Sequence, residues 1–381
     1  MNRRQALFTL TGAAIPAWAA SGAKQYIVYV GTYTNSNKSK GVHAFRMDAK
    51  SGKMDSIGLV GEVANPSFLT IHPNRKNLYA VSEIANYQGQ RSGAVTGFTI
   101  DSATGKLAKL NTVATKGDGA CHLVVDKTGK NVVVANYGGG SVASLPIKDA
   151  AGNLGEATAF IQHKGSSVDG RRQQAPHAHS VNISADNRFV IVADLGLDQV
   201  KVYKLDPAAG TLTPNEPPFA KVTPGGGPRH FNFHPNGKFA YACQEMKSAV
   251  TAFKWDAAQG ELTEIQVIST LPKDYTTPGN STAEIRCHPS GKFLYCSNRG
   301  HDSLAMYRIA KDGQLTHLGN VSTGGRTPRN FNIDPSGRWV IAANQATDNI
   351  VVFKVEKSGM LTPTGQKFDV GAPVCVQFLS V

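Results

Sequence analysis

Charged residues and long apolar runs are both scarce in this sequence. Charged residues make up 18% and hydrophobic residues 41% of its 381 residues, too little charge and too much apolar character for a disordered chain. No stretch beyond the amino terminus is apolar enough to cross a membrane, and runs rich in Glu, Lys, Leu and Ala are absent, which disfavours a helical bundle. Glycine is instead frequent, with 39 residues, and its abundance favours many short strands joined by turns.

Several motifs with a known chemistry are also missing. The sequence has no G-x-S-x-G elbow of a serine hydrolase, no phosphate-binding P-loop and no dinucleotide fingerprint. It has no basic stripe with interleaved aromatic residues, so we expect no nucleic-acid partner. Lys and Arg nevertheless outnumber Asp and Glu by 40 to 27, a net charge of +13, which suits an anionic ligand.

Cysteine is rare and irregularly spaced. The five cysteines are Cys121, Cys243, Cys287, Cys296 and Cys375. An odd number without any C-x-x-C does not predict a disulfide framework, a metal site or a haem site. Each lies in an apolar, strand-like run, so we predict buried free thiols. A bridge between Cys287 and Cys296, which flank one predicted hairpin, is the alternative.

Residues 1–19 have the pattern of a cleavable export signal. A basic start that contains Arg3 and Arg4 precedes a short apolar run and an Ala-x-Ala sequence that ends at Ala19. The paired arginines resemble the twin-arginine signal of bacteria. The run is far shorter than the ~20 residues of a spanning helix, which disfavours the alternative of an uncleaved anchor. We expect the export machinery to deliver residues 20–381 to the periplasm, with no membrane attachment.

A repeated pattern of strands covers the chain after residue 25. Strong copies are Pro228-Arg-His-Phe-Asn-Phe-His-Pro235 and Pro328-Arg-Asn-Phe-Asn-Ile-Asp-Pro335. Seven copies align on one anchor position, at residues 72, 126, 184, 234, 288, 334 and 379. A hairpin of the type Asp-x-x-x-Gly-x-Leu also recurs seven times, with its glycine at residues 52, 105, 152, 210, 260, 313 and 359. A repeat of about 50 residues that contains four short strands is typical of a β-propeller.

The two ends of the chain complete one blade together. The last repeat stops after a single strand, whereas the chain begins with three unmatched strands at residues 26–34, 41–48 and 53–61. The sequence therefore predicts an all-β fold: a seven-bladed β-propeller with four-stranded antiparallel blades. Three amino-terminal strands and one carboxy-terminal strand close its ring, and residues 20–381 form one domain.

Equivalent positions of the repeats form rings around the central channel, because the first strand of a propeller blade is innermost. Five residues before the anchor, the ring is Ser67, Cys121, His179, Arg229, Ala283, Arg329 and Val374. The next ring is Phe68, His122, Ser180, His230, Glu284, Asn330 and Cys375. The ends of the second strands form the ring Tyr33, Glu83, Tyr137, Leu195, Glu245, Arg299 and Gln345. These rings differ in every blade and gather titratable groups, which favours a binding or catalytic site over a channel mouth that is polar only because it is wet.

The residue types at this mouth suit an anionic substrate. Guanidinium groups hold carboxylates and phosphates through paired hydrogen bonds. His179 could act as a general base, and Arg229 or Arg299 could stabilise the negative charge that develops on an ester carbonyl. The alternatives are a surface ion pair of Arg299 with Asp302 and an ion pair between Glu245 and an arginine of the next blade.

A metal site is the competing interpretation of His177-Ala-His179. Residues two apart on a strand project to the same side, so both imidazoles could bind one zinc ion, with His122, His230 or Glu245 as a third ligand. The many arginines oppose a cation, so we expect no metal and no other cofactor. His72, His234 and His288 belong to turns on the opposite side and are expected to be structural.

Five segments carry a family resemblance. They are Val30-Gly-Thr-Tyr-Thr34, Pro176-His-Ala-His-Ser180, Gly227-Pro-Arg-His-Phe231, Asn280-Ser-Thr-Ala-Glu-Ile-Arg286 and Ser297-Asn-Arg-Gly-His301. Over essentially the whole mature chain, the sequence resembles the lactonase family of seven-bladed propellers, which includes bacterial 6-phosphogluconolactonases and the fungal carboxy-muconate lactonizing enzyme.

The resemblance implies metal-independent opening or closing of a lactone that bears anionic groups. It implies a catalytic set of His179, Arg229, Glu245 and Arg299, with Arg286 as the rival for the last position. His179 would activate water, the arginines would bind the acidic group and polarise the carbonyl, and Glu245 would orient His179 or move a proton. The expected substrate-binding residues are His177, His230, Glu284, Arg286 and Arg329.

Two alternatives to a lactone hydrolase stay open at this point. One is a muconate-type cyclase or isomerase, and the other is a non-enzymatic periplasmic binding or scaffold propeller. In the enzymatic interpretation the partner is a small anionic lactone, and the protein is expected to be a monomer.

Overall fold

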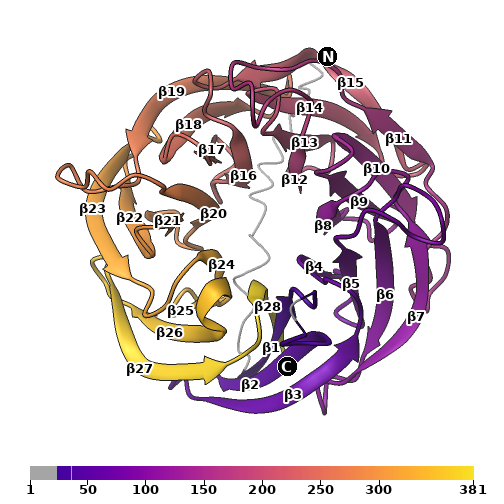
Figure 1. The fold of residues 1–381 in the computed structure, drawn as a ribbon, viewed down its shortest axis with the longest axis horizontal. Coiled ribbons are helices and arrows are strands. Elements are labelled where there is room, and N and C mark those ends of the chain that lie inside the picture. Colours follow the sequence, from indigo (N-terminus) through magenta and orange to yellow (C-terminus); the bar gives the residue numbers. More distant parts are fainter. Residues whose placement is uncertain (1–23, 36) are drawn as a thin grey trace, which may run out of the picture.

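The predicted ring of seven blades is present in the computed structural model, which describes residues 24–35 and 37–381 (Figure 1). The proposed export signal lies outside the described residues. Every blade is a four-stranded antiparallel sheet, and the blades are numbered here in chain order.

Blade 1 contains β28 (Pro373–Ser380), β1 (Gln25–Thr32), β2 (Gly41–Asp48) and β3 (Met54–Glu62). Blade 2 contains β4 (Leu69–Ile71), β5 (Asn77–Ser82), β6 (Ala94–Ile100) and β7 (Leu107–Ala114). Blade 3 contains β8 (Ala120–Val125), β9 (Asn131–Asn136), β10 (Ser141–Pro146) and β11 (Ala159–Gln162). Blade 4 contains β12 (Ala178–Ile183), β13 (Phe189–Asp194), β14 (Gln199–Asp206) and β15 (Thr211–Lys221).

Blade 5 contains β16 (Pro228–Phe233), β17 (Phe239–Gln244), β18 (Ala249–Asp256) and β19 (Glu261–Ser269). Blade 6 contains β20 (Ser281–Cys287), β21 (Phe293–Arg299), β22 (Ser303–Ile309) and β23 (Leu315–Ser322). Blade 7 contains β24 (Pro328–Ile333), β25 (Trp339–Asn344), β26 (Asn349–Val355) and β27 (Leu361–Asp369), with a short 3-10 turn η2 (Gln345–Thr347) after β25.

The ring closes as the sequence predicts. The carboxy-terminal strand β28 pairs antiparallel with β1, with Tyr26 opposite Ser380 and Val30 opposite Val376. β28 therefore becomes the inner strand of blade 1, next to β4 and β24 at the centre of Figure 1. One blade thus ties both ends of the chain into a single sheet.

The second strand of a blade carries most of its apolar surface. All residues of β5, β9, β13 and β25 are buried, because neighbouring blades cover both faces of these strands. Their sequences are accordingly almost continuously apolar, as in NVVVAN of β9. The outer strands β19 and β27 instead mix buried and exposed residues, as expected for strands at the rim.

The His-Pro histidines join adjacent blades. The Nε2 atoms of His72, His234 and His288 lie 2.9, 2.8 and 2.7 Å from backbone carbonyl oxygens of the turns at Gly129, Gly291 and Gly337 in the next blade. Their Nδ1 atoms accept hydrogen bonds from backbone N–H groups two residues later. This network assigns the proton to Nε2 of a neutral ring, and these histidines serve as turn structure.

The glycine of the repeated hairpin packs against the preceding blade. A Cβ atom at Gly313 would lie 2.4 Å from the ring of Phe239, and Gly313 has a φ of +85°. The hydroxyl of Tyr241 also donates to the Gly313 carbonyl oxygen at 2.9 Å. Glycine is therefore needed here both for its backbone conformation and for the closeness of the aromatic ring.

All five cysteines are free, and only Cys287 is not fully buried. This confirms the predicted free thiols and rules out the alternative bridge between Cys287 and Cys296. Cys287 lies opposite Leu294 and Cys296 lies opposite Ile285 in the β20–β21 ladder. The two thiols are diagonal neighbours, farther apart than disulfide geometry allows.

Gly313→Ala is expected to lower the free energy of unfolding by about 2–4 kcal/mol, because it combines a left-handed backbone with overpacking against Phe239. Gly237→Ala is the matched control: φ is +68° and nothing lies within 4 Å of its Cβ position, so only the backbone cost of ~1 kcal/mol applies. Urea denaturation measures both. Equal losses in the two variants would contradict the packing role of Gly313.

Candidate active site

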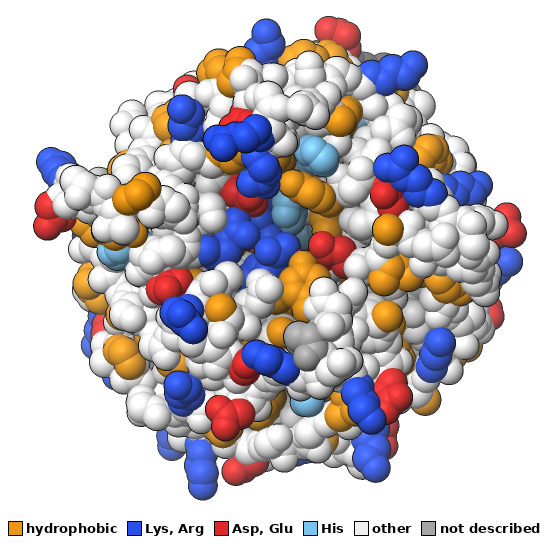
Figure 2. Space-filling view, viewed as in Figure 1, with side chains coloured by type: hydrophobic (Ala, Val, Ile, Leu, Met, Phe, Trp, Pro, Cys, Tyr) orange, Lys and Arg blue, Asp and Glu red, His pale blue; other side chains and the backbone are white. Residues whose placement is uncertain are grey.

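The predicted rings meet in a hollow at one mouth of the central channel. The space between its side chains is about 240 Å³ when the open solvent at the mouth is included. Lys, Arg, His and acidic side chains gather around the central opening in Figure 2. The residues that line the hollow are Ser67, Phe68, Glu83, Cys121, His179, Arg229, His230, Arg329 and Val374.

A β-bulge at the start of the inner strands directs these side chains. The pairing register shifts between Ala178 and Ser180, so His179 is the extra residue of its strand. Cys121, Arg229 and Arg329 occupy the corresponding irregularities of β8, β16 and β24. A bulge re-aims a side chain and interrupts the alternation of strand faces, so one residue per blade is turned toward the channel axis.

Glu245 is the centre of an arginine cluster. Its Oε1 accepts a hydrogen bond from Arg172 Nη2 at 2.8 Å. Its Oε2 lies 3.0 Å from Arg229 Nε and 3.1 Å from Arg299 Nη2. Burial alone would raise the pKa of Glu245, but the charges of Arg299 and Arg229 outweigh it and hold that pKa well below its ordinary value. The carboxylate is thus ionised, and it fixes two buried guanidinium groups beside the hollow.

Two arginines are fixed further by backbone carbonyl oxygens of β20 in blade 6, which is the next blade for Arg229 and the same blade for Arg299. Arg229 Nη1 donates to the Ala283 carbonyl oxygen at 2.5 Å, and Arg299 Nη2 donates to the Thr282 carbonyl oxygen at 2.7 Å. Burial lowers the pKa of Arg299 to about 10, although Glu245 opposes this shift. The guanidinium group of Arg299 therefore stays charged at neutral pH.

Arg329 supplies positive charge from the other side of the hollow. Its guanidinium carbon lies 5.3 Å from the ring centroid of Tyr33, whose hydroxyl donates to Glu83 Oε2 at 2.9 Å. Burial would lower the pKa of Arg329, but Tyr33, Glu83 and Glu245 raise it above its ordinary value. Glu83 thus balances part of the arginine charge in the site.

His179 is uncharged in these surroundings. Burial, together with the charge of Arg229 and the proximity of His230, holds the pKa of His179 well below its ordinary value. Its backbone carbonyl oxygen accepts from the Cys121 thiol at 3.3 Å, and its ring lies edge-on to Tyr137. A neutral imidazole beside arginines can accept a proton from water.

His230 and Glu284 form a second cluster deeper in the channel. His230 Nδ1 lies 3.1 Å from Glu284 Oε2, and Asn330 Nδ2 donates to the same oxygen at 2.5 Å. Arg286 Nη2 reaches that oxygen at 3.4 Å. Burial and the charges of Arg229 and Arg286 hold the pKa of His230 well below its ordinary value. His230 lines the hollow, whereas Glu284 and Arg286 lie behind it.

His177 occupies a different environment from His179. Its ring stacks on Tyr137 with 4.6 Å between centroids, and its Nδ1 lies 2.9 Å from the Tyr137 carbonyl oxygen. The bulge between the two histidines removes the strand alternation on which a shared zinc ion would depend. Within residues 24–35 and 37–381, no group of three or more His, Cys, Asp or Glu side chains could hold a metal ion.

Arg172 is the site residue that sequence reasoning misses. It lies in the loop of residues 163–177 between β11 and β12, and it donates to Glu245 and, at 3.2 Å, to the Tyr137 hydroxyl. The loop belongs to no repeated position, so alignment of the repeats cannot find this arginine. Its one sequence signal is the pair Arg171-Arg172, which three residues separate from the Pro-His-Ala-His segment that begins at Pro176.

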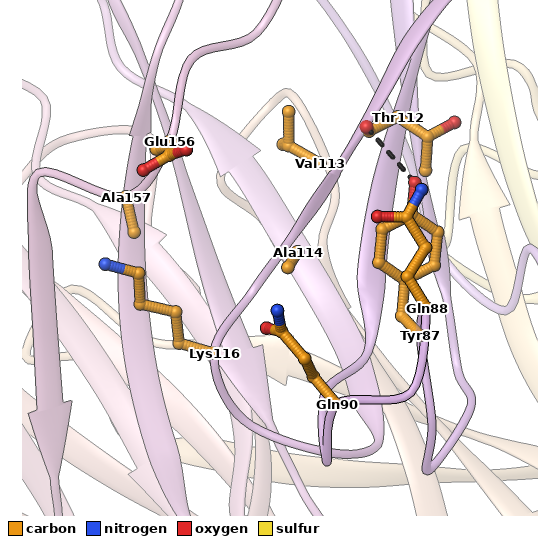
Figure 3. Close-up of a pocket in the computed structure, with 9 residues that line it drawn as sticks. All are labelled: Tyr87, Gln88, Gln90, Thr112, Val113, Ala114, Lys116, Glu156 and Ala157. Carbon is orange, nitrogen blue, oxygen red and sulfur yellow. Dashed lines mark hydrogen bonds between the residues drawn. The ribbon is translucent and has the colours of Figure 1, made fainter.

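A groove on the outer rim contains none of the predicted site residues. It lies between β7 and the segment before β11, and its volume is about 310 Å³. Figure 3 shows the hydroxyl of Tyr87 directed at the Thr112 carbonyl oxygen in this groove. Lys116 and Glu156 are its charged residues, and they are not ion-paired with each other. We therefore place the candidate site at the channel mouth. No helix in the described part of the chain is long and apolar enough to span a membrane.

The free energy of unfolding is expected to fall as the pH falls below about 6.5. The folded pKa values of His122, His179 and His230 are lowered from 6.5, so the unfolded chain takes up protons there first. Each of these histidines then lowers the free energy of unfolding by up to about 1.4 kcal/mol per pH unit. Glu245, with its lowered pKa, adds to the loss in more acidic solution.

Urea denaturation at pH 7.5, 6.5 and 5.5 measures this slope. His230→Gln, which removes one of the three channel histidines named above, is expected to give a shallower slope than the wild-type protein. A free energy of unfolding that is constant between pH 7.5 and 5.5 would contradict the assignment of neutral histidines.

Comparison with known proteins places this geometry in a family. The family model described as "Lactonase, 7-bladed beta-propeller" matches residues 27–378. The 6-phosphogluconolactonase of Bacillus subtilis is 35% identical over 307 residues, which cover 80% of this chain and 84% of the relative. The 6-phosphogluconolactonase of Formosa agariphila is 34% identical over 307 residues, which cover 80% of this chain and 85% of the relative.

A solved structure agrees with these relatives. The periplasmic gluconolactonase of Pseudomonas aeruginosa superposes with a TM-score of 0.87 at 32% identity, covering 94% of this chain and 99% of that one. The comparisons confirm the resemblance inferred from the sequence and the predicted enzyme class, a lactonase. The chain belongs to the lactonase family of seven-bladed β-propellers.

Proposed function

We propose that this chain hydrolyses an anionic sugar lactone of the 6-phosphogluconolactone type, without a metal ion. The observation that carries the proposal is a neutral His179 in the same hollow as Arg229 and Arg329. The names of the relatives from Bacillus subtilis and Formosa agariphila support this substrate class. A base, a set of fixed positive charges and a shallow hollow are the elements that ester hydrolysis of a small anion requires.

In the first step, His179 takes a proton from water as the water oxygen attacks the lactone carbonyl carbon. The carbonyl π bond breaks, and its electron pair moves to the oxygen. Arg229, whose charge is already fixed by Glu245 and by the Ala283 carbonyl oxygen, stabilises this oxyanion. Because the guanidinium group does not have to reorganise, the stabilisation is available at once.

In the second step, the carbonyl forms again and the bond from its carbon to the ring oxygen breaks. The ring oxygen takes the proton from the imidazolium of His179, so the product is a hydroxy acid and the imidazole is again neutral. The acid then loses its proton to solvent. Water and lactone account for every atom of the product.

Glu245 acts in this proposal as a positioning residue. Its carboxylate contacts three guanidinium groups, and among the described residues it has no hydrogen bond to His179. Its lowered pKa also makes it a poor proton donor at neutral pH. We therefore assign to it the placement of Arg229 and Arg299, in place of the proton transfer considered from the sequence.

We also propose that the enzyme works in the periplasm. The pattern of residues 1–19 and the periplasmic gluconolactonase among the solved structures support export. In that compartment the five thiols are protected by burial, since four are fully buried and the fifth is half-buried.

The purified protein is expected to hydrolyse 6-phosphogluconolactone faster than the spontaneous blank, at the same rate with and without a chelator. His179→Gln should lower kcat by about 10²-fold or more, because the general base is lost. Titration of released acid at neutral pH measures both rates, and carboxy-muconate is included in the panel as the substrate of the alternative cyclase.

His317→Gln is the matched control, because His317 lies on the outer strand β23, away from the hollow. It should hydrolyse the lactone at the wild-type rate. Wild-type rates no higher than the blank on every lactone, or a His179→Gln variant as fast as the control, would overturn the proposed function.

A further inference from the structure

Arg172 is the most exposed of the arginines on Glu245. Its side chain is 44% exposed, whereas those of Arg229 and Arg299 are 3% and 14% exposed. Arg229 and Arg299 are also bonded to backbone carbonyl oxygens of blade 6. The contacts of Arg172 are to two side chains alone, Glu245 and Tyr137. Of the three, Arg172 is therefore the guanidinium that can exchange its partner for a ligand without breaking a hydrogen bond to the backbone.

The two carboxylate oxygens of Glu245 contact different arginines. Oε2 is shared by Arg229 and Arg299, whereas Oε1 is contacted by Arg172. If Arg172 turns to a ligand, Glu245 keeps two arginines and its ionised state. A half-exposed ion pair contributes little net stability, so this exchange is easy compared with moving a buried arginine.

One buried carboxylate fixes both ends of the loop that carries Arg172. Asp194 Oδ2 lies 2.5 Å from His163 Nδ1, and Asp194 Oδ1 accepts from the backbone N–H of His177 at 2.8 Å. The second nitrogen of His163 lies 2.9 Å from the Tyr203 hydroxyl. We call these contacts of Asp194 the clasp. The clasp holds His163 and His177, the first and last residues of the loop, against blade 4.

Contacts within the loop fix the backbone at Arg172 itself. Asp169 Oδ1 accepts from the backbone N–H groups of Arg171 and Arg172 at 2.8 and 3.0 Å. Gln173 donates from its side chain to the Leu195 carbonyl oxygen at 2.8 Å. The backbone is therefore anchored on both sides of Arg172 while its half-exposed side chain reaches Glu245 and Tyr137 at the ends of two second strands. Figure 2 shows positive side chains around the opening of the channel.

The charge of the mouth matches a doubly charged anion. The guanidinium groups of Arg172, Arg229, Arg299 and Arg329 supply four positive charges. The carboxylates of Glu83 and Glu245 supply two negative charges, and His179 is neutral. The difference is +2, and a phosphate monoester carries about −1.5 to −2 at neutral pH.

We propose that Arg172 is the specificity-determining residue of the site: the clasped loop presents its guanidinium to the phosphate of the substrate while Arg229 stabilises the reacting carbonyl. This inference rests on the proposed function and extends it, since it assigns recognition of the phosphate and the chemistry of the lactone to different arginines. Arg171, the adjacent arginine, is exposed and has no side-chain contact within the described residues, so it is the matched control.

The test compares 6-phosphogluconolactone with unphosphorylated gluconolactone as substrates of the wild-type protein, Arg172→Gln and Arg171→Gln. For Arg172→Gln, the ratio of kcat/KM for the phosphorylated lactone to kcat/KM for the neutral one is expected to fall by about 10-fold or more, because a charge-assisted contact to the anion is lost. The change should lie mainly in KM. Arg171→Gln should keep the wild-type ratio. An unchanged ratio in Arg172→Gln, or an equal fall in both variants, would overturn the inference.

A binding measurement separates this inference from the proposed function. We expect 6-phosphogluconate to raise the Tm of the wild-type protein and of Arg171→Gln more than gluconate does, and this difference should vanish in Arg172→Gln. If that result appears without turnover of either lactone, the recognition role stands and the proposed hydrolysis fails. If both lactones are hydrolysed but the two acids shift the Tm equally, the hydrolysis stands and the role of Arg172 fails.

Discussion

The contact that joins each blade to the next is the constraint on which the other features depend. A single blade has apolar side chains on both faces of its second strand, and only the two neighbouring blades cover them. The histidines at the ends of the inner strands add a directional tie, from an imidazole N–H to a carbonyl oxygen of the next blade. In blade 3, where the anchor is Asp126, the amide of Asn187 in blade 4 donates to that carboxylate instead. These contacts fix neighbouring blades relative to each other, and the β1–β28 pairing closes the ring. A rigid ring then holds the inner strands at fixed separations before any ligand binds.

This rigidity gives the bulges at the inner strands their effect. In blades 3, 4, 5 and 7 the extra residue is Cys121, His179, Arg229 or Arg329. Each of these side chains would otherwise follow the alternation of its strand and face a neighbouring blade. Because the blades cannot separate, four side chains from four strands meet in one small hollow. Two of them are arginines, and their mutual repulsion is offset by Glu245 and Glu83. The fold thus brings these side chains together, and Glu245 and Glu83, at the ends of second strands, supply the compensating negative charge.

The sequence predicted the features that repeat and missed those that do not. Blade number and ring closure followed from periodic patterns, which report the same physical requirement seven times. The free thiols followed from the odd number of cysteines and from the apolar run around each of them. The meeting of His179, Arg229 and Arg329 in one hollow followed from alignment of the repeats, since equivalent positions of the blades lie at the same height around the channel axis. Arg172 was not predicted because its loop occurs in a single blade and its contact to Glu245 spans 73 residues. The bulges were not predicted either, because a register shift leaves no mark in hydrophobic alternation over two or three residues. The competing zinc interpretation depended on His177 and His179 sharing one side of a strand, whereas the structure makes His179 the extra residue of a bulge and stacks His177 on Tyr137.

Charge placement explains how one site can attract an anion and still contain a usable base. Burial and the charge of Arg229 lower the pKa of His179, so the imidazole is neutral but weakly basic. An anion bound among the guanidinium groups offsets part of their charge, and a nearby negative charge raises the pKa of a histidine. In the proposed mechanism, the basicity of His179 would therefore increase when substrate binds and again as the oxyanion forms. Glu245 limits how far the arginines depress that pKa, because its own charge raises it. Without this carboxylate, Arg229 and Arg299 would be buried beside each other uncompensated, a far costlier arrangement than the paired one. The buried glutamate is thus what allows several arginines and a neutral histidine to share one channel mouth.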